Sequence, residues 1–279
     1  MLLSIAVLVY FLNHIPASIR VNAVLEGIGA RLLRDIKRIF PDENRGERSA
    51  NRPTGTPIIA KETGYIQSIQ FEALERLARK ENGKLNLAVR TGDFVHPSVA
   101  LAYWADRDAI DDCLDDKVRA CFGTGAMRTP AQDMQFLIDE LVEIGLRALS
   151  PGINDPFTAV TAVHWLGAAT AELARRNLTR SFAEEGEEPH LVPLDDDFEH
   201  YLARGFGAMR SGVATNRIAT LVMFDALVDA TTTLDDETRR AAIRREGERL
   251  VRQAREHLAG PELLAVEARF QIFRDAVQR

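Results

Sequence analysis

The sequence is poor in cysteine, and its histidines do not stand at metal-ligand spacing. Among 279 residues the only cysteines are Cys113 and Cys121, eight positions apart in a stretch with a helical pattern, and no Cys-x-x-Cys motif is present. A disulfide scaffold and a structural zinc site are therefore not indicated, and reduced thiols are expected. We predict neither a metal nor a cofactor.

Basic residues are in the minority, and the common catalytic motifs are missing. The formal net charge is -6 and the pI is about 5.6, which argues against nucleic-acid binding because phosphate recognition needs clustered Lys and Arg. The nucleophile elbow, P-loop, zinc-protease and dinucleotide motifs do not occur. Asp196, Asp197 and His200 have the spacing of a weak metal site, but they are more typical of an acidic, capped helix start. An enzymatic activity is not favoured.

The first residues lack charge. Leu2 to Leu12 (LLSIAVLVYFL) contains no charged residue, and the first basic residue is Arg20. This run is too short to cross a bilayer alone, which takes about 20 apolar residues. Three interpretations stay open: a secretory signal, a buried helix of a soluble protein, and the distal part of a transmembrane helix whose earlier part is not in this chain. We favour the third because of the residues next in the chain.

An amphipathic helix is predicted directly after this run. Its apolar residues recur at helical spacing, namely Val21, Val24, Leu25, Ile28, Leu32, Ile36 and Ile39. Between Arg20 and Arg48 there are seven basic and five acidic residues. An excess of basic residues beside a membrane segment favours a cytoplasmic location for the chain beyond that segment. Residues 1–41 are thus expected to be a partial transmembrane helix that continues into an amphipathic helix, which places the protein in the bacterial inner membrane with a cytoplasmic soluble region.

The remainder of the chain predicts an α+β fold that is mostly α. Residues 42–56 have the composition of a linker. Residues 57–105 predict a small β-rich module with a helix from Phe71 to Lys80, and its strands are expected at Pro57–Ala60, Gly64–Ile69, Lys84–Arg90 and Val99–Trp104. The module resembles half of a biotinyl/lipoyl-type barrel-sandwich fold, without the lysine that such carriers modify, so a docking role is expected.

Residues 106–279 predict a C-terminal helical bundle. The apolar spacing and capping residues place its helices at about Arg107–Ala120, Pro130–Leu149, Pro156–Arg176, Asp197–Ser211, Thr215–Thr231, Asp236–Leu258 and Pro261–Gln278. The segment from Glu184 to Glu199 has eight acidic residues and neither Lys nor Arg, which is typical of a solvated loop.

A tight helical reversal is predicted at Ser150 to Pro156 (SPGINDP), where helix stop and start signals adjoin. Asp155 suits an N-cap and Pro156 the first helical position. Arg147 either forms a surface ion pair with Glu143 or holds an anionic ligand beside this turn. The candidate ligand-binding residues are Asp133, Arg147, Ser150, Asn154, Asp155, His164 and Arg210. For His164 alone, a core or interface position is favoured, and no base adjoins Ser150.

Three stretches together resemble one protein family. They are YFLNHIPASIRV, GYIQSIQFEAL with RTGDFVHP, and TPAQDMQFLIDELVEIGLRALSPGINDPFTAV, and they are similar to the bacterial predicted-membrane-protein family called domain of unknown function 2254. The resemblance implies four N-terminal transmembrane helices and then a cytoplasmic region, so that this chain would retain only the end of the fourth. It implies no activity.

The function predicted from the sequence is that of an integral inner-membrane protein with a cytoplasmic regulatory or ligand-sensing region. We expect the membrane and further copies of the chain as partners, with a small ligand possible and no nucleic acid. Two alternatives stay open. One is an enzyme that uses Asp133, Arg147, Asn154 and Asp155 around the turn, and the other is a scaffold that docks partners through the β-rich module.

Overall fold

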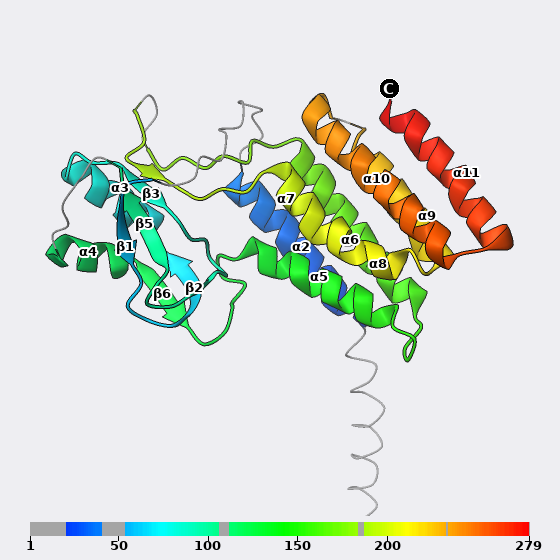
Figure 1. Cartoon of the computed structure of the whole chain (residues 1–279), viewed down its shortest axis with the longest axis horizontal. Coiled ribbons are helices and arrows are strands. Elements are labelled where there is room, and N and C mark those ends of the chain that lie inside the picture. Colours follow the sequence, from blue (N-terminus) through cyan, green and yellow to red (C-terminus); the bar gives the residue numbers. More distant parts are fainter. Residues whose placement is uncertain (1–20, 41–53, 106–111, 184–186, 233, 279) are drawn as a thin grey trace, which may run out of the picture. The chain divides into compact units, whose positions relative to one another are not determined.

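The chain folds into two compact units. A computed structural model describes residues 21–40, 54–105, 112–183, 187–232 and 234–278 (Figure 1). The helical unit consists of residues 1–36, 137–174 and 202–279, and the mixed unit of residues 37–136 and 175–201. The predicted β-rich module, residues 57–105, lies within the mixed unit, which also takes in two later stretches of chain. The predicted end of a transmembrane helix and most of the predicted linker lie outside the described residues.

The mixed unit contains two small sheets. The four-stranded sheet has the order β1 (Thr56–Ile59), β5 (Ala100–Trp104), β3 (Leu85–Leu87) and β7 (Leu191–Val192), in which only the β3–β7 pair is parallel. The three-stranded sheet is antiparallel, with β2 (Gly64–Ile69) between β4 (Phe94–Val95) and β6 (Phe122–Gly125). Because β7 comes from outside residues 57–105, those residues do not form the four-stranded sheet by themselves. The expected likeness of residues 57–105 to a barrel-sandwich module is therefore not confirmed.

The core of the mixed unit reflects the apolar spacing of its elements. Helix α3 (Phe71–Lys80) buries Leu74 and Ala78, four residues apart on one face, and β2 buries Ile66 and Ile69. A bulge between Ile66 and Ser68 shifts the register with β6, which brings both isoleucines to the buried side. Helix α4 (Asp112–Arg119) adds Leu114 and Val118 to the same core.

The helical unit is built from long helices joined by short turns. Its elements are α5 (Met134–Ala148), whose first turn belongs to the mixed unit, α6 (Pro156–Ala174), η1 (Ala203–Gly207), α8 (Ala208–Val213), α9 (Arg217–Asp229), α10 (Glu237–His257) and α11 (Gly260–Val277). The short helix α7 (Phe198–Leu202), which leads into η1, belongs to the mixed unit except for its last residue. Side-chain oxygens of Asn216 and Asp236 accept backbone N–H groups at the starts of α9 and α10, as N-caps do. A single helix was expected at Asp197–Ser211; the chain there forms α7, the π-helical segment η1 and α8 in succession.

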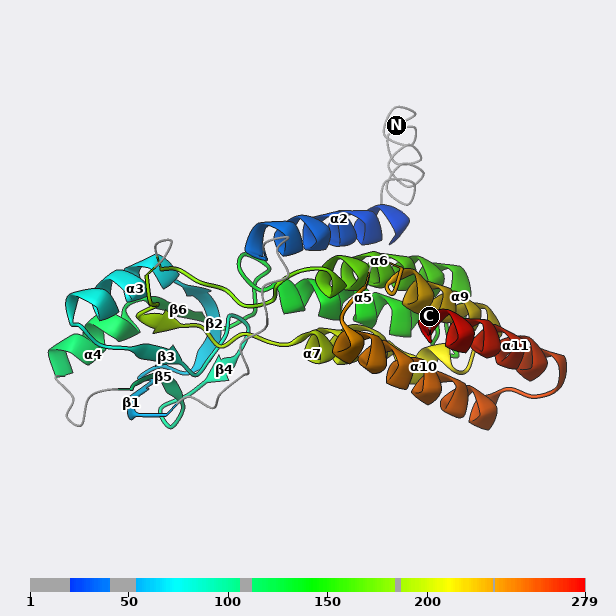
Figure 2. The ribbon, with the colours of Figure 1, turned by 90° about the horizontal axis from the view of Figure 1, so that it is seen from above.

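Helix α2 (Val21–Ile39) packs beside α5 and α6 in the helical unit (Figures 1 and 2). Leu25, Leu32 and Ile36 have no exposed surface, so the predicted amphipathic helix is confirmed. The ring of Trp165 in α6 lies where a Cβ atom on Gly29 would be, only 2.2 Å away, and glycine is therefore what lets the two helices approach.

The fold class predicted from the sequence, α+β and mostly α, is confirmed. Within the described residues, the structure contains no helix that combines the length and the apolar character needed to span a membrane.

Candidate functional site

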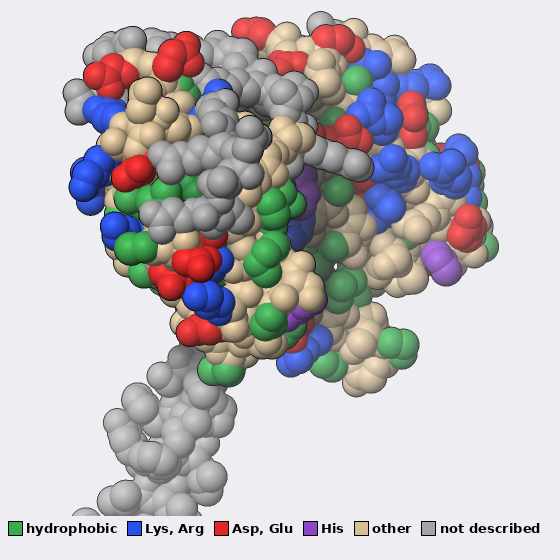
Figure 3. Space-filling view, turned by 60° about the vertical axis from the view of Figure 1, so that its left-hand side comes forward, with side chains coloured by type: hydrophobic (Ala, Val, Ile, Leu, Met, Phe, Trp, Pro, Cys, Tyr) green, Lys and Arg blue, Asp and Glu red, His purple; other side chains and the backbone are tan. Residues whose placement is uncertain are grey.

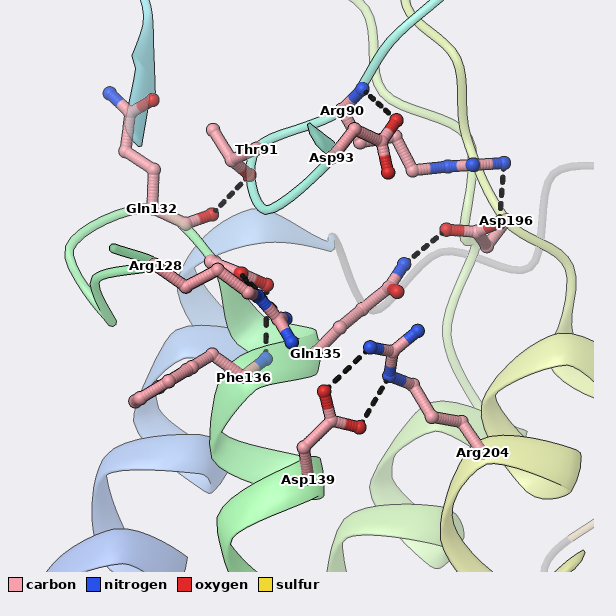
Figure 4. A network of polar contacts seen from close by, with 11 residues as sticks. Arg90, Thr91, Asp93, Arg128, Gln132, Gln135, Phe136, Asp139, Asp196 and Arg204 are labelled. Atoms are coloured by element: carbon pink, nitrogen blue, oxygen red, sulfur yellow. Dashed lines mark hydrogen bonds and ion pairs between the residues drawn. The ribbon is translucent and has the colours of Figure 1, made fainter. Parts of the chain in front are cut away.

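Asp196 is the centre of a polar cluster in the mixed unit. Its carboxylate is buried; Oδ1 lies 2.6 Å from Nη2 of Arg90, and Oδ2 accepts a hydrogen bond of 2.5 Å from Nε2 of Gln135 (Figure 4). Nδ1 of His200 lies 3.5 Å from Oδ1. One side chain thus joins the turn before β4, the first turn of α5 and the start of α7.

Burial decides how the acidic groups of this cluster ionise. It raises the pKa of Asp196, although Arg90 and His200 act in the opposite direction and Asp93 adds a smaller repulsion. Burial likewise raises the pKa of Tyr201, whose ring packs edge-on against Phe40 at 6.2 Å. Burial therefore disfavours the charged form of Asp196 more than its basic neighbours favour it.

Asp133 forms a second charge pair in the same unit. Its Oδ2 lies 2.8 Å from Nε and 2.7 Å from Nη2 of Arg128, while Oδ1 accepts the backbone N–H of Phe136 at 3.0 Å and so caps α5. Gly92 has φ +93°, and a Cβ atom there would lie 2.2 Å from Oδ2 of Asp133. The Thr91 hydroxyl donates to the carbonyl of Gln132 at 2.9 Å (Figure 4). The turn before β4 therefore needs glycine both for its backbone and for this contact.

In the helical unit, Asp139 and Arg204 form a bidentate ion pair. Nε and Nη2 of Arg204 donate to the two carboxylate oxygens at 2.7 and 2.6 Å (Figure 4). Arg204 belongs to η1, and a π-helical turn often marks a position where a side chain must be redirected. The planar fork of arginine fits such a paired geometry.

The predicted turn at Ser150–Pro156 has the geometry expected from its sequence. Asp155 accepts N–H groups of Phe157 and Thr158, each at 3.2 Å, and the Thr158 hydroxyl at 2.6 Å. These hydrogen bonds, the hydroxyl first, lower the pKa of Asp155. Asn154 has φ +49°, and its N–H donates to the carbonyl of Ser150 at 2.9 Å. The N-cap predicted at Asp155 is present.

The other predicted site residues are distributed over the helical unit. Arg147 is exposed and forms the expected ion pair with Glu143 at 2.5 Å, while the Ser150 hydroxyl donates to the carbonyl of Arg147 at 2.6 Å. His164 is exposed on α6, because α6 turns this side chain away from its buried face; the core half of the favoured core or interface position is therefore wrong, and an interface position stays a prediction. Arg210 lies 2.5 Å from the buried carboxylate of Glu246. Asp133, by contrast, belongs to the mixed unit. Ligand binding by these residues stays a prediction.

The acidic segment is only partly the solvated loop that its charge predicts. Asp196 is buried, and Asp195 lies 2.5 Å from Nε of Arg180. Asp197 accepts the N–H of His200 at 2.7 Å, so the interpretation as a helix cap holds for Asp197. Within the described ranges, no cluster of His, Cys, Asp or Glu could hold a metal ion.

Sequence reasoning missed Arg90, Gln135 and the role of Asp196. No local signal marked Asp196, because a run of aspartates is ordinarily hydrated. Its partner, Arg90, lies more than 100 residues earlier in the sequence. As arranged, the cluster can hold three segments of the mixed unit together through one buried carboxyl group.

The chain resembles several curated proteins. It is 28% identical over 267 residues to an uncharacterized protein of Mycobacterium bovis and, at the same identity, to uncharacterized proteins from two strains of Mycobacterium tuberculosis. The matches cover 92% of this chain and 51% of each relative, so the chain spans about half the length of the curated relatives it matches. No solved structure matches it. A family model described as "Predicted membrane protein (DUF2254)" matches residues 1–229, and the chain belongs to this family of predicted membrane proteins.

Proposed function

We propose that the two units form a cytoplasmic regulatory or ligand-sensing region of a membrane protein, and that the protein works as a homo-oligomer. The observation that supports this best is the packing of α2. This helix comes soon after the uncharged opening of the chain, and its residues Leu25, Leu32 and Ile36 are buried in the helical unit. A displacement of the preceding segment would therefore act on a packed core rather than on a loose linker.

The path of the chain gives further support. It passes from one unit to the other after residues 36, 136, 174 and 201. The Asp196 cluster includes residues just before two of these passages, Gln135 and His200. A ligand that alters the cluster would thus act on segments that continue into the helical unit. Such coupling needs the ligand to favour one arrangement over another.

A ligand screen on the full chain tests the proposal. The protein, solubilised in detergent, is heated with metabolites and nucleotides, because a ligand that binds only the folded form raises its apparent stability. We expect at least one compound to raise the midpoint temperature of unfolding and to change the hydrogen exchange of α2. Chemical crosslinking of the solubilised protein should give an oligomer. A strict monomer that shows no compound-dependent change would contradict the proposal.

A docking role for the mixed unit is the second candidate, and one observation favours it. Phe94, in the two-residue edge strand β4, is 54% exposed beside Tyr65. Figure 3, in which the mixed unit faces the reader, shows hydrophobic side chains among the charged ones. An exposed aromatic side chain at the edge of a sheet offers an apolar contact to a partner, whereas a strand of two residues gives little backbone for the addition of another strand. A photo-crosslinking residue at position 94 should then give one discrete product in cells, and the same residue at exposed Lys61 should not.

A further inference from the structure

Two large apolar side chains are exposed around the turn between α5 and α6. Ile153 is 61% and Phe157 69% exposed to solvent. The turn itself contains Pro151 and Gly152, which carry no charge. A Cβ atom added at Gly152 would meet no atom within 4 Å. In a water-soluble surface, large apolar groups that lie so close together indicate a binding surface.

The start of α2 lies at the same end of the helical unit. Gly29 of α2 contacts Trp165 of α6. Val21 lies eight positions before Gly29, and Phe157 lies eight positions before Trp165. Figure 1 shows both helices starting from this end. With a rise of about 1.5 Å per residue, Val21 and Phe157 therefore lie at nearly the same level along the helix axes.

A second contact gives the same alignment. Arg31 of α2 is close enough to Glu140 of α5 to lower its pKa, against the larger effect of burial. Helix α5 runs in the direction opposite to α2. Val21 lies ten positions before Arg31, and Ser150 lies ten positions after Glu140, so both lie toward the same end. Val21 and Val24 are themselves partly exposed and apolar. The first turn of α2 and the turn between α5 and α6 thus share one end, here called the apolar end (Val21, Val24, Ile153 and Phe157).

We propose that the apolar end is a membrane-contact surface, with Ile153 and Phe157 inserted at the lipid headgroup level. The chain enters α2 at this end soon after the uncharged residues 2–12, and its family is one of membrane proteins. A bilayer is therefore the apolar partner that the chain itself brings to this end. Phe and Ile gain free energy when they leave water for the interface. Arg147, exposed at the end of α5, pairs with the exposed carboxylate of Glu143, and a headgroup phosphate would compete with that carboxylate for the guanidinium.

Fluorescent labels at single exposed cysteines in the full chain test this proposal; Cys121 is buried and is left in place. In a Cys113→Ser background, an environment-sensitive label is attached at Phe157→Cys or Ile153→Cys, and the protein is reconstituted into vesicles of phosphatidylcholine and phosphatidylglycerol. Both labels should shift to the blue and be quenched by brominated lipid. Phe157→Asp, read by the label at position 153, should weaken the insertion about tenfold, since burial of one such side chain is worth roughly that factor.

The chain offers matched controls of the same residue types. Phe94 in the mixed unit is 54% exposed, and Ile272 on α11 is 59% exposed. The label at Ile272→Cys, in the same unit as Phe157, should stay in water and escape the quencher, and the label at Phe94→Cys reports on the mixed unit separately. Equal quenching at positions 157 and 272 would overturn the proposal, and so would a chain that does not float with the vesicles.

Shielding of position 157 that grows with protein concentration in the absence of vesicles would also overturn the proposal, because it would assign the surface to a second copy of the chain. The inference rests on the membrane attachment of the family and not on ligand sensing. No ligand is added in this assay, so its result is separate from that of the ligand screen.

Discussion

Removal of the Asp196 carboxylate should destabilise the mixed unit specifically. In Asp196→Ala, the guanidinium of Arg90 and the amide of Gln135 lose their shared acceptor. Breaking a buried ion pair by removing one partner costs about 3–5 kcal/mol. The Arg90 side chain is 28% exposed, so water offsets part of that loss and leaves about 2–3 kcal/mol. The lost hydrogen bond of Gln135 adds about 1 kcal/mol.

The two tryptophans allow each unit to be followed separately. Trp104 is buried in the mixed unit and Trp165 lies in the helical unit. Denaturant unfolding of Asp196→Ala, followed by Trp104 in a Trp165→Phe background, should give a free energy of unfolding about 3 kcal/mol below that of the parent. The neighbouring change Asp197→Ala removes only an exposed cap and should cost about 1 kcal/mol. Equal losses for the two variants would refute the assigned role of Asp196.

The pH dependence of the same residue has a definite sign. Because burial raises the pKa of Asp196 in the folded protein, its contribution to stability is fully present below the unfolded value of about 3.9. That contribution is lost as the pH rises through the folded pKa. Asp196→Asn does not titrate, so its deficit relative to the parent should be smaller at neutral pH than in acid. A deficit that grows toward neutral pH would contradict this reasoning.

Three further changes probe the helical unit. Gly29→Leu should displace the ring of Trp165, red-shift its emission and cost about 1–3 kcal/mol. Gly27→Leu, at a position where an added Cβ atom meets no atom within 4 Å, should leave the emission unchanged and cause no loss of stability. Asp155→Asn should destabilise α6 by about 1 kcal/mol or less in thermal unfolding; since the pKa of Asp155 is lowered, the deficit should vanish as the pH falls through its folded value. Arg239→Met, which removes a buried donor to the last carbonyls of α6, should cost about 2–3 kcal/mol in urea unfolding. A loss below about 0.5 kcal/mol would contradict its capping role.

Local pattern was enough to predict much of the secondary structure. Strand Gly64–Ile69 and helix Phe71–Lys80 have the predicted bounds to the residue, because alternating burial and a three-to-four spacing are written into consecutive positions. The short strands β4, β6 and β7 were not predicted. Strand β6 contains two glycines and β7 has two residues, so both depend on partners distant in sequence, which local pattern does not reveal.

The candidate site shows the same contrast between contacts that are local in sequence and contacts that are distant. The cap at Asp155 and the pair of Arg147 with Glu143 involve residues within four positions, and both were predicted. The contact of Asp196 with Arg90 joins residues more than 100 positions apart. Its charge run predicted hydration, and only the fold buries it. The exposure of Phe157 was equally invisible, because an apolar residue in a helix start is ordinarily taken as core.

The repeated passage of the chain between the units limits how this protein can be dissected. The helical unit needs three separate stretches of sequence and the mixed unit needs two. A truncated chain that begins after residue 39 would lack α2 and would uncover the Trp165 ring that Gly29 contacts. Neither unit can be expressed alone as one continuous fragment. Loss of function in a simple truncation would therefore indicate misfolding and not the role of the missing residues.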